Sequence, residues 1–272
     1  MRRLIYIALI LLLPVGVWGQ TVQIDTLYCA AHADSGGGLT GFDQTPSYEN
    51  ARATTPADYH SATNLTIGQD KQGDGDFGVY RAFIMFPSIQ DIIQSSDIDS
   101  AKLVLDGSAP EGGADFDYTV YSSWFDVSGS GFDANKDFNN FDGWKAGLNA
   151  YTGIALTDSL ADSEYNAGAN IFTFNANGLD TLDVHRSGFL KIVVMSIEDV
   201  KASEPADAEL LTMEGVTESN KPFLIIYSLA AEEGYTVTSA RGNVIHEARG
   251  HVVKGLDDLR KVAWKFLNMV IK

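Results

Sequence analysis

Two acidic segments of this chain have the residue types that bind calcium. One of them, the segment from Asp133 to Asn139, carries oxygen-bearing side chains at every other position, as in the first half of a calcium-binding loop. It departs from that pattern at Phe138, where a glycine is expected, and at Trp144, where a bidentate acid is expected. Aspartate, asparagine and glycine are also ordinary turn residues, so plain turn formation is the alternative. The candidate ligands of a structural calcium ion are Asp70, Asp74 and Asp76 in one segment and Asp133, Asn135 and Asp137 in the other.

Aromatic residues gather in the middle of the chain, between residues 118 and 151. A sugar ring stacks on an exposed aromatic ring, so aromatic side chains on loops are candidates for carbohydrate binding. Large aromatic side chains are mostly buried, and the alternative is therefore that these rings cap the core. The candidate carbohydrate-binding residues are Trp124, Trp144 and Tyr151.

The histidines form no catalytic pattern. His246 and His251 flank Glu247 as in a zinc protease, but they are five positions apart, whereas zinc ligands on one helical face stand four apart. The Gly-x-Ser-x-Gly motif of serine hydrolases is missing from the sequence. We therefore expect no enzyme, and no cofactor other than the calcium ion considered above. Because 36 acidic residues can always place two carboxylates together, a polysaccharide-degrading enzyme is the least favoured alternative.

The net charge of the chain limits the kinds of molecule that it can bind. Its 36 acidic and 19 basic residues give a net charge of -17. A surface this acidic repels phosphate backbones, so we expect no binding to nucleic acid. The single cysteine rules out a disulfide within the chain, and the fold must therefore depend on a hydrophobic core.

The N-terminus has the features of a secretion signal. Arg2 and Arg3 precede an apolar run from Leu4 to Leu13, and the segment Val17–Gly19 places small residues at the two positions that signal peptidase inspects, with cleavage near Gly19. The run is shorter than the roughly 20 residues of a membrane-spanning helix, which is the alternative. We therefore predict a signal peptide at residues 1–19 and a protein that is secreted or lies at the cell surface.

The next region, residues 20–229, has the pattern of an antiparallel β-sandwich. Short segments alternate apolar with polar residues, and glycine-rich stretches such as Ser35–Gly38 and Gly73–Asp76 are interpreted as turns between them. Short helical turns are expected only near 89–93 and 179–184. The fold class predicted is all-β. The expected strands are 22–28, 64–67, 79–86, 100–105, 116–121, 171–174, 190–197 and 223–227.

Residues 230–272 have a different character. From Gly234 to Lys272 there are seven basic and three acidic residues, a net charge of +4. Apolar residues from Gly255 onward recur at helical spacing, so we predict an amphipathic helix at the C-terminus. Its apolar stripe is a candidate surface for self-association, and the alternatives are packing on its own sandwich or on an anionic membrane. The stripe consists of Leu256, Leu259, Ala263, Phe266, Leu267 and Val270.

The segment Val79–Phe86 predicts a strand with one unusual residue. Arg81 shares a strand face with Phe83 and Met85, while Ala82, Ile84 and Phe86 share the other. An arginine among apolar neighbours needs a buried carboxylate or carbonyl partner. We therefore assign Arg81 a structural role in the framework, in preference to ligand binding.

Three stretches of the chain resemble a known family. Val79–Phe86 followed by Ile98–Leu105 resembles the central strands of DNRLRE-type domains, the group that includes carbohydrate-binding module family 96. Gly188–Val194 and Asn220–Tyr227 are similar to the last two strands of such domains. Pro87 stands where relatives have an aspartate. The resemblance implies an extracellular, jelly-roll-like module of surface proteins or polysaccharide-degrading systems, without implying catalysis.

These features lead to two functional hypotheses. The first is a secreted, non-catalytic β-sandwich that binds a polysaccharide or a cell-surface glycan, or that acts in adhesion. The second is a structural subunit of an extracellular assembly, such as a filament, a sheath or a virion fibre. In the second, the basic tail docks on the acidic body of a neighbouring copy.

Overall fold

The computed structural model describes strands and helices that all lie within Met1–Ala230. The predicted signal peptide and the predicted tail with its helix lie outside the described residues. The described residues are 22–30, 36–43, 47–53, 59–71, 75–90, 97–108, 111–112, 116–124, 138–139, 141–145 and 150–229.

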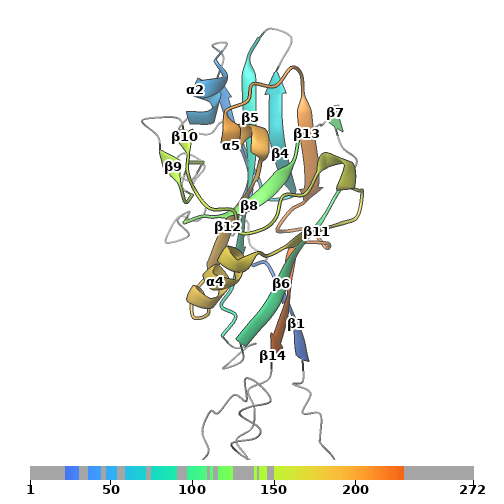
Figure 1. Ribbon diagram of the computed structural model, residues 1–272. Helices are drawn as coiled ribbons and strands as arrows, with labels where there is room; N and C mark the ends of the chain where they lie inside the picture. Colours follow the sequence, from blue (N-terminus) through green and yellow to red (C-terminus); the bar gives the residue numbers. More distant parts are fainter. Residues whose placement is uncertain are drawn as a thin grey trace, which may run out of the picture. The chain divides into compact units, whose positions relative to one another are not determined.

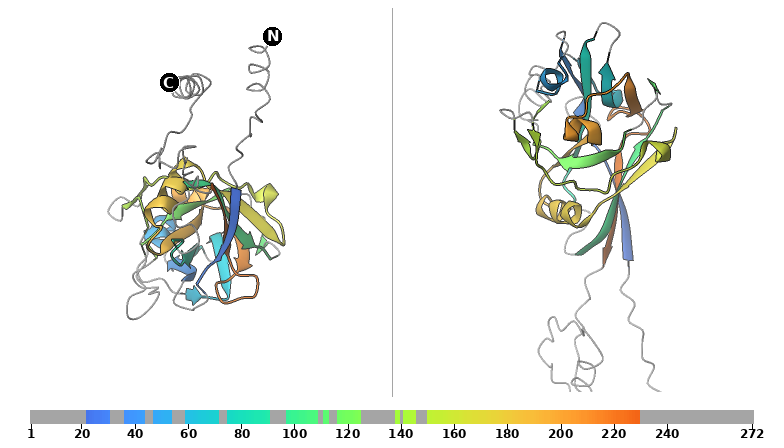
Figure 2. Two further views of the ribbon diagram at one scale, coloured as in Figure 1. Left: turned by 90° about the horizontal axis from the view of Figure 1, so that it is seen from below. Right: turned by 45° about the horizontal axis from the view of Figure 1, so that its top comes forward.

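The described part of the chain is mainly β-structure in two large antiparallel sheets (Figure 1), which confirms the predicted strand-rich, antiparallel architecture. Figure 2 shows strands of the four-stranded sheet side by side. Its order is β1 (Val22–Tyr28), β14 (Phe223–Leu229), β6 (Asp97–Asp106) and β11 (Ala169–Thr173). The main path of the eight-stranded sheet is β3 (Tyr59–Ser61), β2 (Gly36–Asp43), β5 (Phe77–Phe86), β4 (Asn64–Lys71), β13 (Glu209–Glu214) and β7 (Glu111–Gly112). To this path β12 (Leu190–Ser196) adds by pairing with β5 and with β8 (Tyr118–Ser122).

Short helices connect the strands. Among the described residues, none of them has the length and apolarity needed to cross a bilayer. The turn expected near 179–184 is confirmed as part of α4, and in the segment 89–93 only the first two residues are described, as a bend and a turn. The remaining elements are α2 (Tyr48–Ala53), β9 (Trp144–Lys145), β10 (Ala150–Tyr151), the 3-10 helix η3 (Asp162–Glu164), α4 (Ala176–Val184) and α5 (Ile197–Lys201).

The main hydrophobic core contains side chains from both large sheets. Leu103 and Ile226 of the four-stranded sheet and Ile84 and Val194 of the eight-stranded sheet belong to one buried cluster. Each such aliphatic side chain contributes about 1.5–3 kcal/mol on leaving water. A second cluster lies on the other face of β5, where Phe83 and Met85 contact it. The alternation predicted for β5 is thus confirmed, and β5 is buried on both faces.

One predicted turn is wrong. The glycine-rich stretch interpreted as a turn at Ser35–Gly38 enters β2 at Gly36, and the strand pairs along its length with β5. Glycine carries no side chain that could reveal a period of two, so the sequence pattern was uninformative there. The ladder of backbone hydrogen bonds to β5 offsets the entropic cost of ordering these glycines.

The single cysteine is buried next to β1. Cys29 has 2% of its surface exposed and its Sγ lies 4.0 Å from the carbonyl oxygen of Val216. Burial raises the pKa of this thiol to about 12, although nearby Lys221 acts in the opposite direction. Cys29 is therefore a protonated, unreactive core residue.

Candidate functional site

Arg81 and Asp199 form a buried ion pair between β5 and α5. The Arg81 guanidinium makes two hydrogen bonds to the carboxylate, from Nε to Oδ2 at 2.7 Å and from Nη2 to Oδ1 at 3.1 Å. Arg52 of α2 also donates from Nε to Oδ1, at 2.9 Å. All three side chains are at most 1% exposed. The buried partner that the strand pattern requires for Arg81 is therefore Asp199.

The rest of the Arg81 guanidinium is also enclosed. Nη1 donates to the carbonyl oxygen of Phe138 at 3.0 Å and to Oδ1 of Asn139 at 2.6 Å. The guanidinium carbon lies 4.1 Å from the ring centroid of Phe138 and 5.0 Å from that of Trp144. Hydrogen bonds and aromatic faces thus surround the charge, which supports the framework role that we predict for Arg81.

Asp199 is fixed from its own helix. Its backbone N–H donates to Oγ of Ser196 at 3.0 Å, which caps the N-terminus of α5. Burial alone would raise the pKa of the Asp199 carboxyl, but Arg81 and Arg52 outweigh burial and hold that pKa below its ordinary value. The Asp199 carboxylate therefore stays ionised between two guanidinium groups.

The three aromatic candidates for carbohydrate binding are not brought together. Trp144 contacts the second core cluster, with its ring centroid 5.8 Å from that of Phe141. Tyr151 packs edge-on against Tyr121 at a centroid distance of 4.5 Å. Trp124, by contrast, is 53% exposed just after β8. Of the three, Trp124 is the ring that a ligand can reach.

The calcium candidates are only partly described. Asp70 on β4 and Asp76 before β5 are both half-buried. The described residues include no group of three or more acidic, histidine or cysteine side chains arranged to hold a metal ion. The calcium site stays a prediction, because the other four candidates lie outside the described residues, namely Asp74, Asp133, Asn135 and Asp137.

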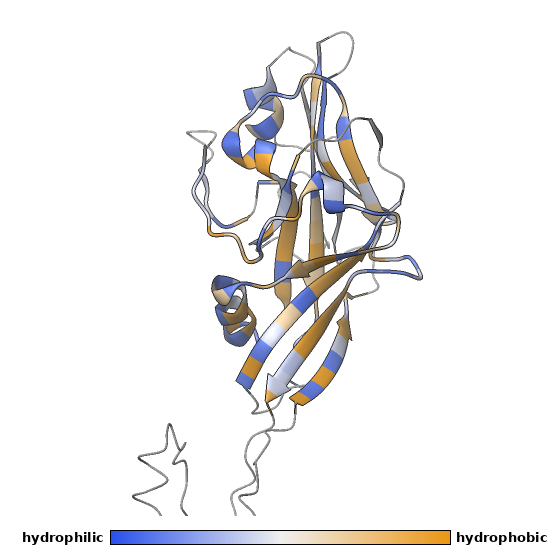
Figure 3. Ribbon diagram, turned by 45° about the vertical axis from the view of Figure 1, so that its right-hand side comes forward, coloured by the Kyte–Doolittle hydropathy of each residue, from blue (hydrophilic) through white to orange (hydrophobic). Residues whose placement is uncertain are grey.

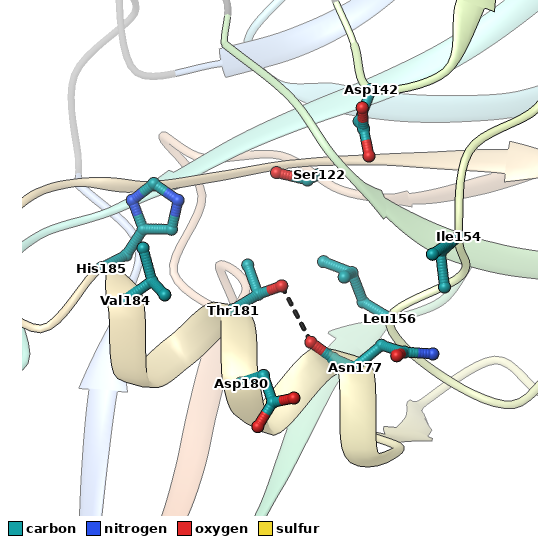
Figure 4. A pocket seen from close by; sticks show the side chains of 9 residues that line it. All are labelled: Ser122, Asp142, Ile154, Leu156, Asn177, Asp180, Thr181, Val184 and His185. Atoms are coloured by element: carbon teal, nitrogen blue, oxygen red, sulfur yellow. Dashed lines mark hydrogen bonds between the residues drawn. The ribbon is translucent and has the colours of Figure 1, made fainter.

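An open groove of about 310 Å³ lies between the end of β8 and α4 (Figure 4). Ser122 and Asp142 border it on the strand side, across from the side chains of α4. His185 lies near one end and Ile154 near the other. We call this feature the α4 groove. Its lining residues are Ser122, Asp142, Ile154, Leu156, Asn177, Asp180, Thr181, Val184 and His185.

Local sequence signals position the helix that forms one wall of the α4 groove. Asn175 caps α4, because its Oδ1 accepts the N–H of Gly178 at 3.1 Å while its Nδ2 donates to the carbonyl oxygen of Ala155 at 3.0 Å. Gly178 lies so close to the preceding segment that a Cβ there would stand 2.1 Å from the carbonyl oxygen of Leu156. The absence of a side chain at Gly178 therefore allows α4 to lie this close to Leu156, which lines the groove.

The α4 groove combines polar and apolar surfaces. Thr181 donates its hydroxyl proton to the carbonyl oxygen of Asn177 at 2.8 Å, which orients its lone pairs outward as acceptors. Carboxylates, an amide and an imidazole add acceptors and donors, while Ile154 and Val184 are 60% and 77% exposed. Such a surface can hydrogen-bond hydroxyl groups and contact C–H faces at the same time. No pattern in the sequence predicts this groove, since its residues come from four separate segments of the chain.

One carboxyl outside the α4 groove makes stability depend on pH. Burial, helped by the charges of Glu209 and Asp117, raises the pKa of Glu198 from 4.5 to about 7. Its buried Oε2 has no hydrogen-bond partner among the described residues. The folded state thus binds more protons than the unfolded state between about pH 4.5 and 7, and stability falls as the pH rises through that window.

We expect Glu198→Gln to raise the melting temperature at pH 8 and to leave it nearly unchanged at pH 4, where the carboxyl is protonated in both states. Thermal unfolding followed by circular dichroism at the two pH values measures this. The exposed Asp207→Asn is the control and should show no such pH-dependent gain. An equal effect of Glu198→Gln at both pH values would contradict the assignment.

Comparison of this chain with protein-family models and with curated proteins found no match.

Proposed function

We propose that this chain is a secreted, non-catalytic module with a jelly-roll-like fold that binds carbohydrate in the α4 groove. The observation that carries the proposal is the composition of the groove beside an exposed tryptophan. Ser122 borders the groove at the end of β8, and Trp124 follows it by two positions. In an extended chain, residues two apart project from the same face, so we place the Trp124 ring beside the groove on the side of Ser122.

The α4 groove suits a short stretch of a sugar chain. Its volume lies at the lower end of the range for small-ligand sites, about 300–1,000 Å³. Sugar hydroxyl groups both donate and accept hydrogen bonds, which matches Asp142, Asn177 and Thr181. The C–H face of a sugar ring would stack on Trp124 and contact Ile154.

Charge favours neutral sugars over acidic ones. Asp142 and Asp180 line the groove, and the whole chain carries a net charge of -17. A uronate or sulfate group would be repelled by both the local and the overall field. Binding without turnover is supported by the exposure of both carboxylates to solvent, because a catalytic acid–base carboxyl usually lies in a desolvated environment.

Secretion is supported by the N-terminal sequence pattern, and carbohydrate as the ligand class agrees with the resemblance to DNRLRE-type domains. A structural calcium ion at the two acidic segments belongs to the same proposal. If calcium is bound, a chelator will lower the melting temperature of the protein.

A comparison of two tryptophan variants, one at an exposed ring and one at a packed ring, tests the proposal. Trp124→Ala is expected to weaken binding to neutral glycans about fivefold or more, because one stacking contact on an aromatic ring is worth about 1–3 kcal/mol, and to leave the melting temperature unchanged. Trp144→Ala should lower the melting temperature, since that ring contacts the buried cluster. A glycan array followed by calorimetric titration measures glycan binding by each variant, and thermal unfolding followed by circular dichroism measures its melting temperature.

The wild-type array provides the control. It should show neutral glycans bound above sulfated and uronate-containing ones. A wild type that binds no glycan, or a Trp124→Ala variant that binds as well as wild type, would refute the proposal.

A further inference from the structure

The outward side of the four-stranded sheet carries large apolar residues on β1, β14 and β11, beside the polar Thr26, Ser100 and Thr173. On β1, Ile24 and Tyr28 point to this side and are 61% and 52% exposed, while Leu27 points inward and is buried. They stand opposite Tyr227 and Phe223 of β14, and Ile171 at the far edge is 46% exposed. Figure 3 shows apolar residues recurring along these strands. We define the outer face as Ile24, Tyr28, Ile171, Phe223, Ile225 and Tyr227.

The outer face is separate from the core. Leu224 and Ile226, the β14 residues between its members, are fully buried in the main cluster, so β14 carries apolar residues on both sides of this sheet. An antiparallel sheet with one side facing water normally carries polar residues on that side. Exposures of half or more on Ile24 and Tyr28 mean that no described element covers them. An apolar patch of this extent marks an interaction surface.

The outer face is also nearly free of acidic groups. By strand alternation, Lys102 lies within it and Asp97 and Asp106 stand at its ends, and Lys221 lies beside it, with its Nζ 5.8 Å from the centroid of the Tyr28 ring. Lys102 lies against a ring of the face, with its Nζ 5.9 Å from the centroid of Tyr227. Aromatic enrichment with loss of charge is the composition of interface centres. In a chain of net charge -17, this is a face where two copies can approach.

The size of the outer face fits a weak dimer. Four strands about 4.8 Å apart and seven residues long at about 3.4 Å each span roughly 400 Å². Two such faces in contact remove on the order of 1,000 Å² of accessible surface from water, which is near the lower limit of specific interfaces. Two identical sheets have the same twist and can therefore pack face to face around a two-fold axis.

We propose that the outer face is a self-association surface on which a second copy of this chain docks with the same face. Self-association gives a dimer with a dissociation constant on the order of 10–100 µM. The dimer carries two α4 grooves and gains avidity on a polymeric ligand. The surface is distinct from the C-terminal stripe predicted from the sequence.

Sedimentation velocity over a protein concentration range of about 1 to 300 µM tests this on the chain expressed from Gln20 onward, a range that brackets the expected constant. Ile24→Asp should raise the dissociation constant at least about tenfold, because two-fold symmetry places two buried charges in the interface. Ile154→Asp is the matched control, since Ile154 in the α4 groove is 60% exposed, and it should leave the dimer unchanged. Unaltered melting temperatures show that both variants fold.

A wild type that stays monomeric at every concentration would overturn the proposal. So would a dimer that tolerates Ile24→Asp, including one that is lost only when residues 255–272 are removed. Glycan binding by the monomer does not enter this test, so it can fail without the groove proposal failing.

Discussion

Replacing Asp199 by alanine is expected to lower the free energy of unfolding by about 3–5 kcal/mol, a large fraction of the total stability of a folded domain. The reason is the charge that remains. Arg81 and Arg52 are at most 1% exposed and share this carboxylate, so its removal takes an ion-pair partner away from two buried guanidinium groups. Urea denaturation followed by tryptophan fluorescence measures the loss.

The surface ion pair between Lys71 and Glu204 is the control for this prediction. Its two atoms are 2.8 Å apart, but the side chains are 35% and 55% exposed. Glu204→Ala should therefore cost less than about 1 kcal/mol. If Asp199→Ala cost no more than Glu204→Ala, the account of the buried cluster would be wrong.

Replacing Gly178 by alanine should destabilise the protein by about 1–3 kcal/mol and abolish glycan binding in the α4 groove. Alanine is the better helix former, so helix propensity alone predicts a gain of about 1 kcal/mol. Packing reverses the sign, because the new Cβ would stand 2.1 Å from the carbonyl oxygen of Leu156 and 2.5 Å from a ring carbon of Phe174. Helix α4 must then move away from Leu156 and Phe174, which changes the shape of the groove.

Gly188→Ala is the matched control. A Cβ at Gly188 meets no atom within 4 Å, so the substitution should leave both stability and binding within experimental error of wild type or slightly raise stability. Melting temperature and calorimetric titration with the best glycan measure both variants. A Gly178→Ala variant that is more stable than wild type would show that propensity prevails over packing at this position.

The strands could be predicted because their burial alternates. Every expected strand overlaps an observed one, and Val79–Phe86 shows why, since alternate residues enter two different clusters. Strand β2 was missed because its first residues are glycines. Strand β13 was also missed. The buried residues of β13 are Glu209, Leu211 and Met213. The acid at the first of these positions hides the alternation of apolar and polar residues.

The candidate site could be predicted much less well. The position of Arg81 among apolar strand residues predicted a buried partner. That partner, Asp199, is 118 residues away in the sequence, and only the fold brings the two together. The aromatic candidates were chosen by residue type, which cannot tell the packed Trp144 from the exposed Trp124. The α4 groove depends on contacts between segments whose individual sequences are ordinary. Long-range packing decides each of these three outcomes.

Chemical-shift mapping of the isotopically labelled chain with soluble neutral oligosaccharides tests the central claim most directly. The account predicts saturable shifts of the backbone amides of Ser122, Trp124, Ile154 and Thr181, with the oligosaccharide recovered uncut. Shifts confined to other parts of the chain, no shifts with any neutral oligosaccharide, or cleavage of the sugar during the titration would contradict it.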